Sequence, residues 1–190
     1  MRIVGGDFRG RALAALGKGD AGAHLRPTTD RLRETIFNVL AGGRFGDPVP
    51  GARVLDLFAG TGALALEALS RGAEQAVLVD DGRKAQALIR QNIDICGAGD
   101  RARLIRRDAR KLGPNDGAPF DLIFLDPPYG RDMGAPALKA ALAGGWIASG
   151  ALVVWEEAGA VIPPEGIRIL DARRYGDSTV TFATAAPAEE

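Results

Sequence analysis

The chain has 190 residues, of which 46% are hydrophobic and 25% charged, and its formal net charge is zero. These values fit a globular domain with enough apolar material for a core, and the neutral balance excludes a protein coated in positive charge. The single cysteine, Cys96, excludes an internal disulfide. The arginine-containing N-terminus lacks the apolar segment of a signal peptide, and no run of about 18 apolar residues occurs, so we expect a cytoplasmic protein.

The first part of the chain, residues 1–50, is predicted to be a small extension of hairpin and helix. Arg2–Val4 and Arg11–Leu13 alternate in polarity around glycines, which favours a hairpin. Apolar residues at helical spacing predict a helix over Arg31–Ala41, with Asp30 as its cap. Residues 1–45 hold eight basic and four acidic residues, a balance of +4, so the remainder carries −4. A basic end on a neutral protein favours a local contact with an anionic partner.

Residues 51–184 alternate between strand and helix patterns and are predicted to form the main domain. We expect strands at Arg53–Phe58, Gln75–Val79, Ala102–Arg106, Phe120–Leu125 and Ala151–Trp155, with helices at Ala63–Arg71, Arg83–Cys96 and Ala135–Ala143. This alternation implies right-handed crossovers and a doubly wound α/β fold with helices on both faces of a mostly parallel sheet. Ile167–Ala172 and Thr179–Ala183 predict an antiparallel hairpin that completes a seven-stranded sheet. Residues 185–190 are expected to be a frayed tail.

A cofactor site is predicted where the first strand of this domain ends. Ligands of such sheets bind at the carboxyl ends of the strands, and here Asp56 is followed by a turn that contains Gly60 and Gly62. A carboxylate at this place would repel a pyrophosphate and attract a cation. S-adenosylmethionine has an ammonium and a sulfonium centre and no phosphate, so the pattern favours it over NAD. The predicted cofactor residues of this segment are Asp56, Phe58, Ala59, Gly60, Thr61 and Gly62.

Two further acids follow the next two strands. Asp80 ends the second strand, where a carboxylate can accept hydrogen bonds from the ribose hydroxyls. Asp108, followed by Ala109, comes after the third strand and is predicted to accept from the adenine amino group. Any one of these acids alone would be an ordinary surface carboxylate, but their position after successive strands favours one shared site. No metal site is predicted.

The fourth strand ends in Asp126-Pro127-Pro128-Tyr129, and we predict that these residues are catalytic. The prolines form a rigid turn, the carboxylate of Asp126 accepts hydrogen bonds, and Tyr129 offers a ring on which a base can stack. An exocyclic amine is a poor nucleophile because its lone pair is delocalised into the ring. Two acceptors, the Asp126 carboxylate and the Pro127 carbonyl, can hold its N–H bonds and direct the lone pair at a methyl group.

The order of these motifs resembles the amino-group methyltransferases of nucleic acids, and three further segments resemble the RsmD family. The segments are Met1–Arg11, Arg26–Asn38 with R-P-T-x-D-x-x-R-E, and Tyr175–Ser178. The resemblance implies a Rossmann-like class I fold dependent on S-adenosylmethionine, and methylation of the guanine N2 amino group in bacterial 16S ribosomal RNA. It also implies RNA contacts by Arg9, Arg11, Arg26, Thr28 and Arg33. The neutral net charge favours a small-subunit assembly particle as substrate, and a monomer is expected.

Other functions remain open at this point. A DNA adenine-N6 methyltransferase shares the chemistry, although such enzymes usually need an added recognition region. A protein-glutamine methyltransferase would suit Asn rather than Asp at position 126. An RNA-binding module with a vestigial cofactor pocket is the non-enzymatic alternative, but both motifs are intact. Glu156 and Glu157, at the end of the fifth strand, are expected to be a solvated pair.

Overall fold

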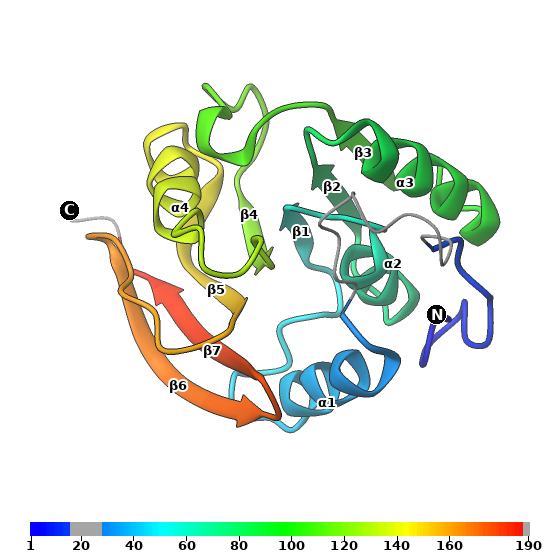
Figure 1. Cartoon of the computed structure of the whole chain (residues 1–190), viewed down its shortest axis with the longest axis horizontal. Helices are drawn as coiled ribbons and strands as arrows, with labels where there is room; N and C mark the ends of the chain where they lie inside the picture. Colours follow the sequence, from blue (N-terminus) through cyan, green and yellow to red (C-terminus); the bar gives the residue numbers. More distant parts are fainter. Residues whose placement is uncertain (16–27, 188–190) are drawn as a thin grey trace.

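The computed structural model describes residues 1–15 and 28–187, and these form a seven-stranded sheet with helices on both faces (Figure 1). The strands are Arg53–Leu57 (β1), Gln75–Val79 (β2), Ala102–Ile105 (β3), Phe120–Leu125 (β4), Ile147–Glu157 (β5), Ile167–Tyr175 (β6) and Ser178–Ala185 (β7). Their order along the sheet is β3-β2-β1-β4-β5-β7-β6, and β7 runs antiparallel to both of its neighbours. The order reverses between β1 and β4, which places the topological switch point of the sheet there.

The central strands are apolar on both sides, so helices cover both faces. One face is covered by α1 (Asp30–Ala41), α2 (Ala63–Ser70) and α3 (Arg83–Cys96), and the other by α4 (Gly134–Ala143) and the short 3₁₀ helix η1 (Ala109–Lys111). Along β1, Val54 belongs to the first hydrophobic cluster and Leu55 to the second, as the alternation of a strand requires. Within the described residues, no helix has the length and apolarity that crossing a membrane would need.

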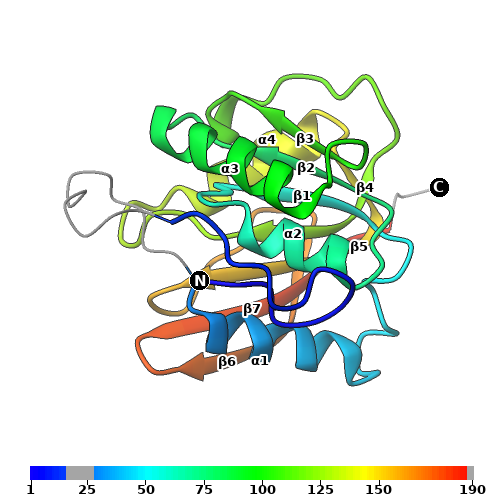
Figure 2. The same cartoon turned by 90° about the vertical axis from the view of Figure 1, so that its right-hand side faces the viewer.

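The N-terminal segment packs across α2 (Figure 2). Ile3, Phe8 and Leu13 are buried in the same hydrophobic cluster as α1, α2 and α3. The backbone N–H of Phe8 donates to the Ser70 hydroxyl over 2.8 Å, which fixes the segment against the end of α2. Residues from both sides of position 50 therefore contribute to one core.

The predicted N-terminal hairpin is present, and one detail of the next helix differs. Arg2 and Ala12 form an antiparallel bridge, and beside it the backbone N–H of Ile3 donates to the Arg11 carbonyl over 3.0 Å. Helix α1 is capped by the Thr29 hydroxyl, which accepts from the N–H of Leu32, while Asp30 is the first helical residue. The expected helix is otherwise present.

The last strands are longer than predicted. β5 begins at Ile147 rather than Ala151, since it pairs with β4 on one side and β7 on the other. β7 continues to Ala185, which is buried, and the N–H of Ala186 donates to the Gly166 carbonyl over 2.7 Å. The predicted start of a frayed tail at residue 185 is therefore too early, because sheet pairing orders these two residues.

Candidate active site

A cavity of about 830 Å³ opens at the switch point, at the carboxyl ends of β1, β2 and β4. Its volume is in the range of small-molecule sites. The predicted site residues in its wall are Thr28, Asp56, Phe58, Ala59, Gly60, Thr61, Asp80, Asp126, Pro127, Pro128 and Tyr129. Two motifs that are far apart in the sequence thus face the same space, because β1 and β4 are neighbours in the sheet.

Asp56 is buried at the base of this cavity, and one of its oxygens has no partner among the described residues. Its Oδ2 atom accepts from the backbone N–H of Ala65 over 3.2 Å, while Oδ1 is buried without a hydrogen bond. Burial raises the pKa of Asp56 to about 7, which the Ala65 hydrogen bond only partly offsets. A buried acceptor of this kind requires a donor, so the site fits the cationic end of a ligand such as S-adenosylmethionine.

Asp80 holds the glycine turn against the end of β2. Its Oδ2 accepts from the N–H of Gly60 over 2.9 Å, and its Oδ1 accepts from the N–H of Gly82 over 2.8 Å. Burial raises the pKa of Asp80 despite these bonds. Each carboxylate oxygen can accept a further bond, so Asp80 can also meet ribose hydroxyls. Gly62 ends the turn at φ 77°, where a Cβ atom would lie 2.8 Å from the Leu78 side chain.

Asp126 lies beside the turn after β1, because β4 pairs in parallel with β1. Its backbone N–H donates to the Leu57 carbonyl over 3.4 Å, and its Oδ2 accepts from the Thr28 hydroxyl over 3.0 Å. Burial and the nearby charge of Glu156 raise the pKa of Asp126 well above its usual range. A carboxyl with a raised pKa is a better proton acceptor near neutral pH than an ordinary carboxyl.

Tyr129 also faces the cavity, but its hydroxyl is directed to the protein interior. The hydroxyl donates to Glu156 Oε1 over 2.6 Å and lies 2.8 Å from the Ser178 hydroxyl. Burial and the hydrogen bond to Glu156 raise the Tyr129 pKa. The phenol therefore stays neutral and fixed, and its ring remains the part that a base can contact.

Three predicted cofactor residues do not line the cavity: Gly62, Asp108 and Ala109. The Asp108 carboxylate caps η1 through the N–H of Arg110 and forms an ion pair with the Arg110 side chain at 2.7 Å. The hydrogen bond from the Arg110 side chain lowers the Asp108 pKa. The predicted adenine contact of Asp108 has no support in this geometry, because the neighbouring arginine holds the carboxylate. Arg110 itself reaches the cavity wall.

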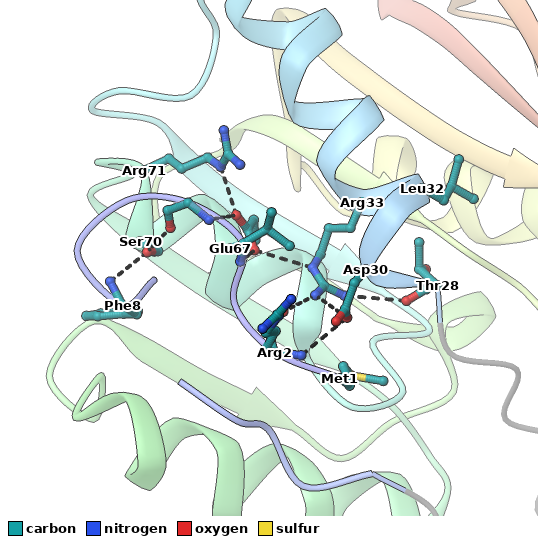
Figure 3. A network of polar contacts seen from close by, with 12 residues as sticks. Met1, Arg2, Phe8, Thr28, Asp30, Leu32, Arg33, Glu67, Ser70 and Arg71 are labelled. Carbon is teal, nitrogen blue, oxygen red and sulfur yellow. Dashed lines mark hydrogen bonds and ion pairs between the residues drawn. The ribbon is translucent and has the colours of Figure 1, made fainter. Parts of the chain in front are cut away.

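Arg33, which was predicted to contact RNA, is buried under the N-terminal segment (Figure 3). Its guanidinium pairs with Glu67 at 3.3 Å and with Asp30 at 2.9 Å, and it donates to the backbone carbonyls of Arg2 and Thr28. The side chain is 0% exposed. The prediction of a phosphate contact at Arg33 is therefore wrong, because α1 turns this residue toward α2.

Thr28 was also predicted to contact RNA, and the structure gives its hydroxyl a different partner. Thr28 is buried, and its hydroxyl shares its one proton between Asp126 Oδ2, 3.0 Å away, and Glu156 Oε2, 3.3 Å away. Thr28 also lines the cavity, so its predicted contact with RNA stays a prediction. Arg26 lies outside the described residues.

The chain resembles known proteins over nearly its whole length. Residues 1–184 match the family model described as conserved hypothetical protein 95. Ribosomal RNA small subunit methyltransferase D of Escherichia coli strain K12 is 38% identical over 156 residues, which cover 82% of this chain and 74% of that protein. This chain belongs to the RsmD family.

Other comparisons agree with membership of the RsmD family. The Haemophilus influenzae protein with the same name as the Escherichia coli relative is 29% identical over 181 residues, covering 93% of this chain and 89% of that protein. The solved structure of yhhF from Escherichia coli, which its name assigns provisionally as a methyltransferase, has a TM-score of 0.82 at 34% identity and covers 98% of both chains. The predicted Rossmann-like fold and the predicted class of enzyme, a methyltransferase, are confirmed. A methyl donor of the S-adenosylmethionine type follows from that class.

Glu156 is a residue of this RsmD site that the sequence analysis missed. It was expected to be solvated, but it is only 6% exposed and accepts from Thr28, Tyr129 and Ser178. The signal was available, because Glu156 lies near the carboxyl end of its strand, as do Asp56 and Asp126. What the sequence lacked was the knowledge that β5 lies directly beside β4.

Of the arginines expected to contact RNA in an RsmD protein, Arg9 and Arg11 are exposed at the N-terminal segment. Arg11 also donates from Nη1 to the Ile95 carbonyl over 3.0 Å and packs over the Phe8 ring at 5.0 Å. At the cavity mouth, the exposed Arg131 is a further cation that the sequence analysis did not select.

Proposed function

We propose that this chain transfers a methyl group from S-adenosylmethionine to the exocyclic N2 amino group of a guanine in 16S ribosomal RNA. The observation on which this depends is that Asp56, whose Oδ1 has no partner among the described residues, and the Asp126–Tyr129 segment line one cavity. The carboxylate that would bind the cation of the cofactor and the acceptors that would bind the target amine then lie around the same cavity. The names of the relatives support ribosomal RNA as the substrate.

The residues on the β1 and β2 side of the cavity would hold the cofactor. S-adenosylmethionine, when bound, supplies an electrophilic methyl group on a sulfonium centre. Asp56 would accept from its ammonium group, and Asp80 would accept from its ribose hydroxyls. The turn at Gly60 lets the backbone approach the ligand closely. Asp108 has no part in the proposal, since Arg110 holds its carboxylate.

The residues after β4 would hold the target amine. Thr28 donates to Asp126 Oδ2, and among the described residues no hydrogen bond engages Oδ1. Oδ1 and the Pro127 carbonyl are then the two acceptors for the amine N–H groups, which directs the lone pair away from the base plane. The ring of Tyr129 supports the base by stacking, worth about 1–3 kcal/mol. Asp126 is also the nearest group to accept the proton that the nitrogen loses.

The surroundings of the site suit a substrate that presents its guanine within a structured particle. The net charge of zero gives little general attraction to RNA. Exposed Arg9 and Arg11 would contact phosphates locally, while proteins of a small-subunit assembly particle would supply further contacts. We place the enzyme in the cytoplasm as a monomer.

The test is methyl transfer to defined substrates by the purified chain. Labelled S-adenosylmethionine is offered with naked 16S RNA, with small-subunit particles and with duplex DNA, and the products are digested and identified by mass. We expect N2-methylguanine, formed faster on particles than on naked RNA. Methyladenine in DNA, or no cofactor binding in a calorimetric titration, would contradict the proposal.

The variant Asp126→Ala separates chemistry from cofactor binding. It removes one amine acceptor and the proton acceptor, so we expect at least about a 100-fold loss of transfer rate. Affinity for S-adenosylmethionine, measured by calorimetry, should change little because Asp56 and the glycine turn are intact. A fully active Asp126→Ala enzyme would exclude the proposed role of this carboxyl.

A further inference from the structure

Glu156, at the end of β5, is the common acceptor of three hydroxyl groups. The Thr28 hydroxyl donates to Oε2 over 3.3 Å. The hydroxyls of Tyr129 and Ser178 reach Oε1 at 2.6 and 2.9 Å. None of the ion pairs among the described residues involves Glu156. All three partners of Glu156 are hydroxyl groups, and a carboxylate oxygen accepts from such donors.

Sheet pairing explains why these groups meet. Leu125 of β4 is paired with Trp155 of β5. The next residues of the two strands' paths, Asp126 and Glu156, therefore lie at the same end of the sheet. Ser178 begins β7, which pairs with β5 on the other side. Thr28 approaches from the segment before α1 and bridges the two carboxylates with one hydroxyl. Glu156 itself does not line the cavity.

We propose that Glu156 is a positioning residue for methyl transfer, which fixes both ends of the Asp126–Tyr129 segment through Thr28 and Tyr129 without touching the substrate. This inference rests on the proposed function, because it assumes that Asp126 and Tyr129 receive the target base. Through Thr28, Glu156 orients Asp126 so that Oδ1 faces the amine. Through its direct bond it holds the Tyr129 hydroxyl in the interior and leaves the ring for stacking. Ser178 also donates to Glu156, and this contact connects the Tyr175–Ser178 segment with the site.

The charges that face Asp126 come from two strands. Glu156 and Glu157 belong to β5, and Asp56 belongs to β1. Burial and Glu156 raise the Asp126 pKa, and the Thr28 hydrogen bond lowers it. Losing the Glu156 charge should therefore lower this pKa, and losing the Thr28 hydroxyl should raise it. If the enzyme turns over only when Asp126 is ionised, kcat increases as the pH rises through the Asp126 pKa.

The activity test compares Glu156→Gln, Thr28→Val and Thr28→Ser in the full chain, with Glu157→Gln as the matched control. The control removes one charge from the same strand end but none of the three hydroxyl bonds. We expect Glu156→Gln and Thr28→Val to lower kcat roughly 10- to 100-fold, the size of a misplacement effect. KM for the RNA and affinity for S-adenosylmethionine should stay near the wild-type values. Thr28→Ser should restore most of kcat, and Glu157→Gln should keep it.

The pH dependence of kcat distinguishes positioning from a general loss of structure. We expect the acid limb of the profile to move to lower pH in Glu156→Gln and to higher pH in Thr28→Val. Opposite shifts support the proposal. An unchanged kcat in Glu156→Gln, a loss confined to KM, or shifts in the same direction would overturn it.

A second readout needs no RNA and no catalysis. The chain has two tyrosines, so absorbance titration in a Tyr175→Phe background follows Tyr129 alone. Glu156→Gln should let Tyr129 ionise at lower pH than in the parent, because the hydrogen bond and charge that raise its pKa are weakened. An identical titration overturns the inference, whereas absent methylation by the wild-type chain would instead refute the proposed function. If Glu156→Gln fails to fold, Ser178→Ala and Thr28→Val replace it in these measurements.

Discussion

Single residues of this protein show how burial sets both chemistry and stability. Asp56 is the clearest case, because desolvation raises its pKa from 3.8 to about 7 and leaves Oδ1 without a partner. A group whose pKa is raised in the folded state makes the ionised folded protein less stable. The penalty begins above the unfolded pKa of Asp56 and grows as pH rises toward the folded value. A cationic ligand relieves this penalty. Asp56 therefore lowers the stability of the free protein and raises its affinity for a cationic ligand.

The variant Asp56→Asn tests that exchange. It should raise the unfolding free energy of the free protein at pH 8 by about 2 to 4 kcal/mol, since one pKa unit corresponds to about 1.4 kcal/mol. The gain should shrink toward pH 5. Affinity for S-adenosylmethionine should fall roughly 10- to 100-fold, which corresponds to the loss of a charged hydrogen bond. Denaturant melts and calorimetry across pH measure both effects, and a variant that is less stable at pH 8 would contradict this account.

At the scale of elements, a buried carboxylate joins α1, α2 and the N-terminal segment (Figure 3). Glu67 of α2 is fully buried and accepts from the backbone N–H groups of Val4 and Gly5 at 2.9 and 2.8 Å. It also pairs with Arg33 of α1 and with Arg71 of its own helix. Removing Arg33 would take away one of the two cations that compensate this buried carboxylate.

The ion pair between α1 and α2 should therefore be costly to break. We expect Arg33→Ala to lower the unfolding free energy by about 3 to 5 kcal/mol, because the buried Glu67 loses one of its two charged partners. Arg31→Ala on the same helix is the matched control, since Arg31 is exposed, and its effect should be within about 0.5 kcal/mol. Urea denaturation measures the difference. Equal effects of the two variants would show that the pair does not hold α1 in place.

Two glycines of the N-terminal segment should differ in their tolerance of a side chain. Both have positive φ angles, but a Cβ on Gly6 would lie 1.8 Å from the Ser70 carbonyl oxygen, whereas Gly10 has nothing within 4 Å. Gly10→Ala should therefore cost only the backbone strain, about 1 to 2 kcal/mol. Gly6→Ala should also detach the segment from α2. Hydrogen exchange at Asp7 and Phe8 should be faster in Gly6→Ala alone, and equal exchange in both variants would disprove the distinction.

At the scale of the whole molecule, the part of the chain before residue 50 is built into the core of the sheet domain. Ile3, Phe8, Ile36 and Leu40 lie in one hydrophobic cluster with residues of α2, α3 and β4. An extension with a separate core would bind RNA without affecting the catalytic cavity. A shared core instead means that the N-terminal segment, α1 and Thr28 belong to the same folded unit as the sheet.

We therefore predict a single cooperative unfolding transition for the full chain. Trp146 and Trp155 report on the face of the sheet that is covered by α4, and hydrogen exchange at Ile3 and Phe8 reports on the opposite face. The two probes should give the same unfolding free energy. A chain that starts at residue 51 should be much less stable, since it exposes the apolar surface that α1 and the N-terminal segment cover. An early, separate transition of the N-terminal residues would contradict this prediction.

The amino-acid sequence by itself determined the types of most elements and the chemistry of the two main motifs. Short apolar runs, helical spacing and turn residues act locally, so the strands from β1 to β4 and helices α2 and α3 were predictable within a few residues. That Asp56 and Asp126 line one cavity was predictable, because the carboxyl ends of parallel strands meet at one edge of a sheet.

Only the tertiary structure decided which side chains are buried and what they contact. Arg33 has the same local appearance as an exposed helix arginine, and its burial depends on Glu67, which comes 34 residues later. Thr28, Asp126, Glu156 and Ser178 meet because β4, β5 and β7 are adjacent and aligned in register. Strand order and register are set by packing over the whole sheet, and no local pattern around any one of these residues contains that information.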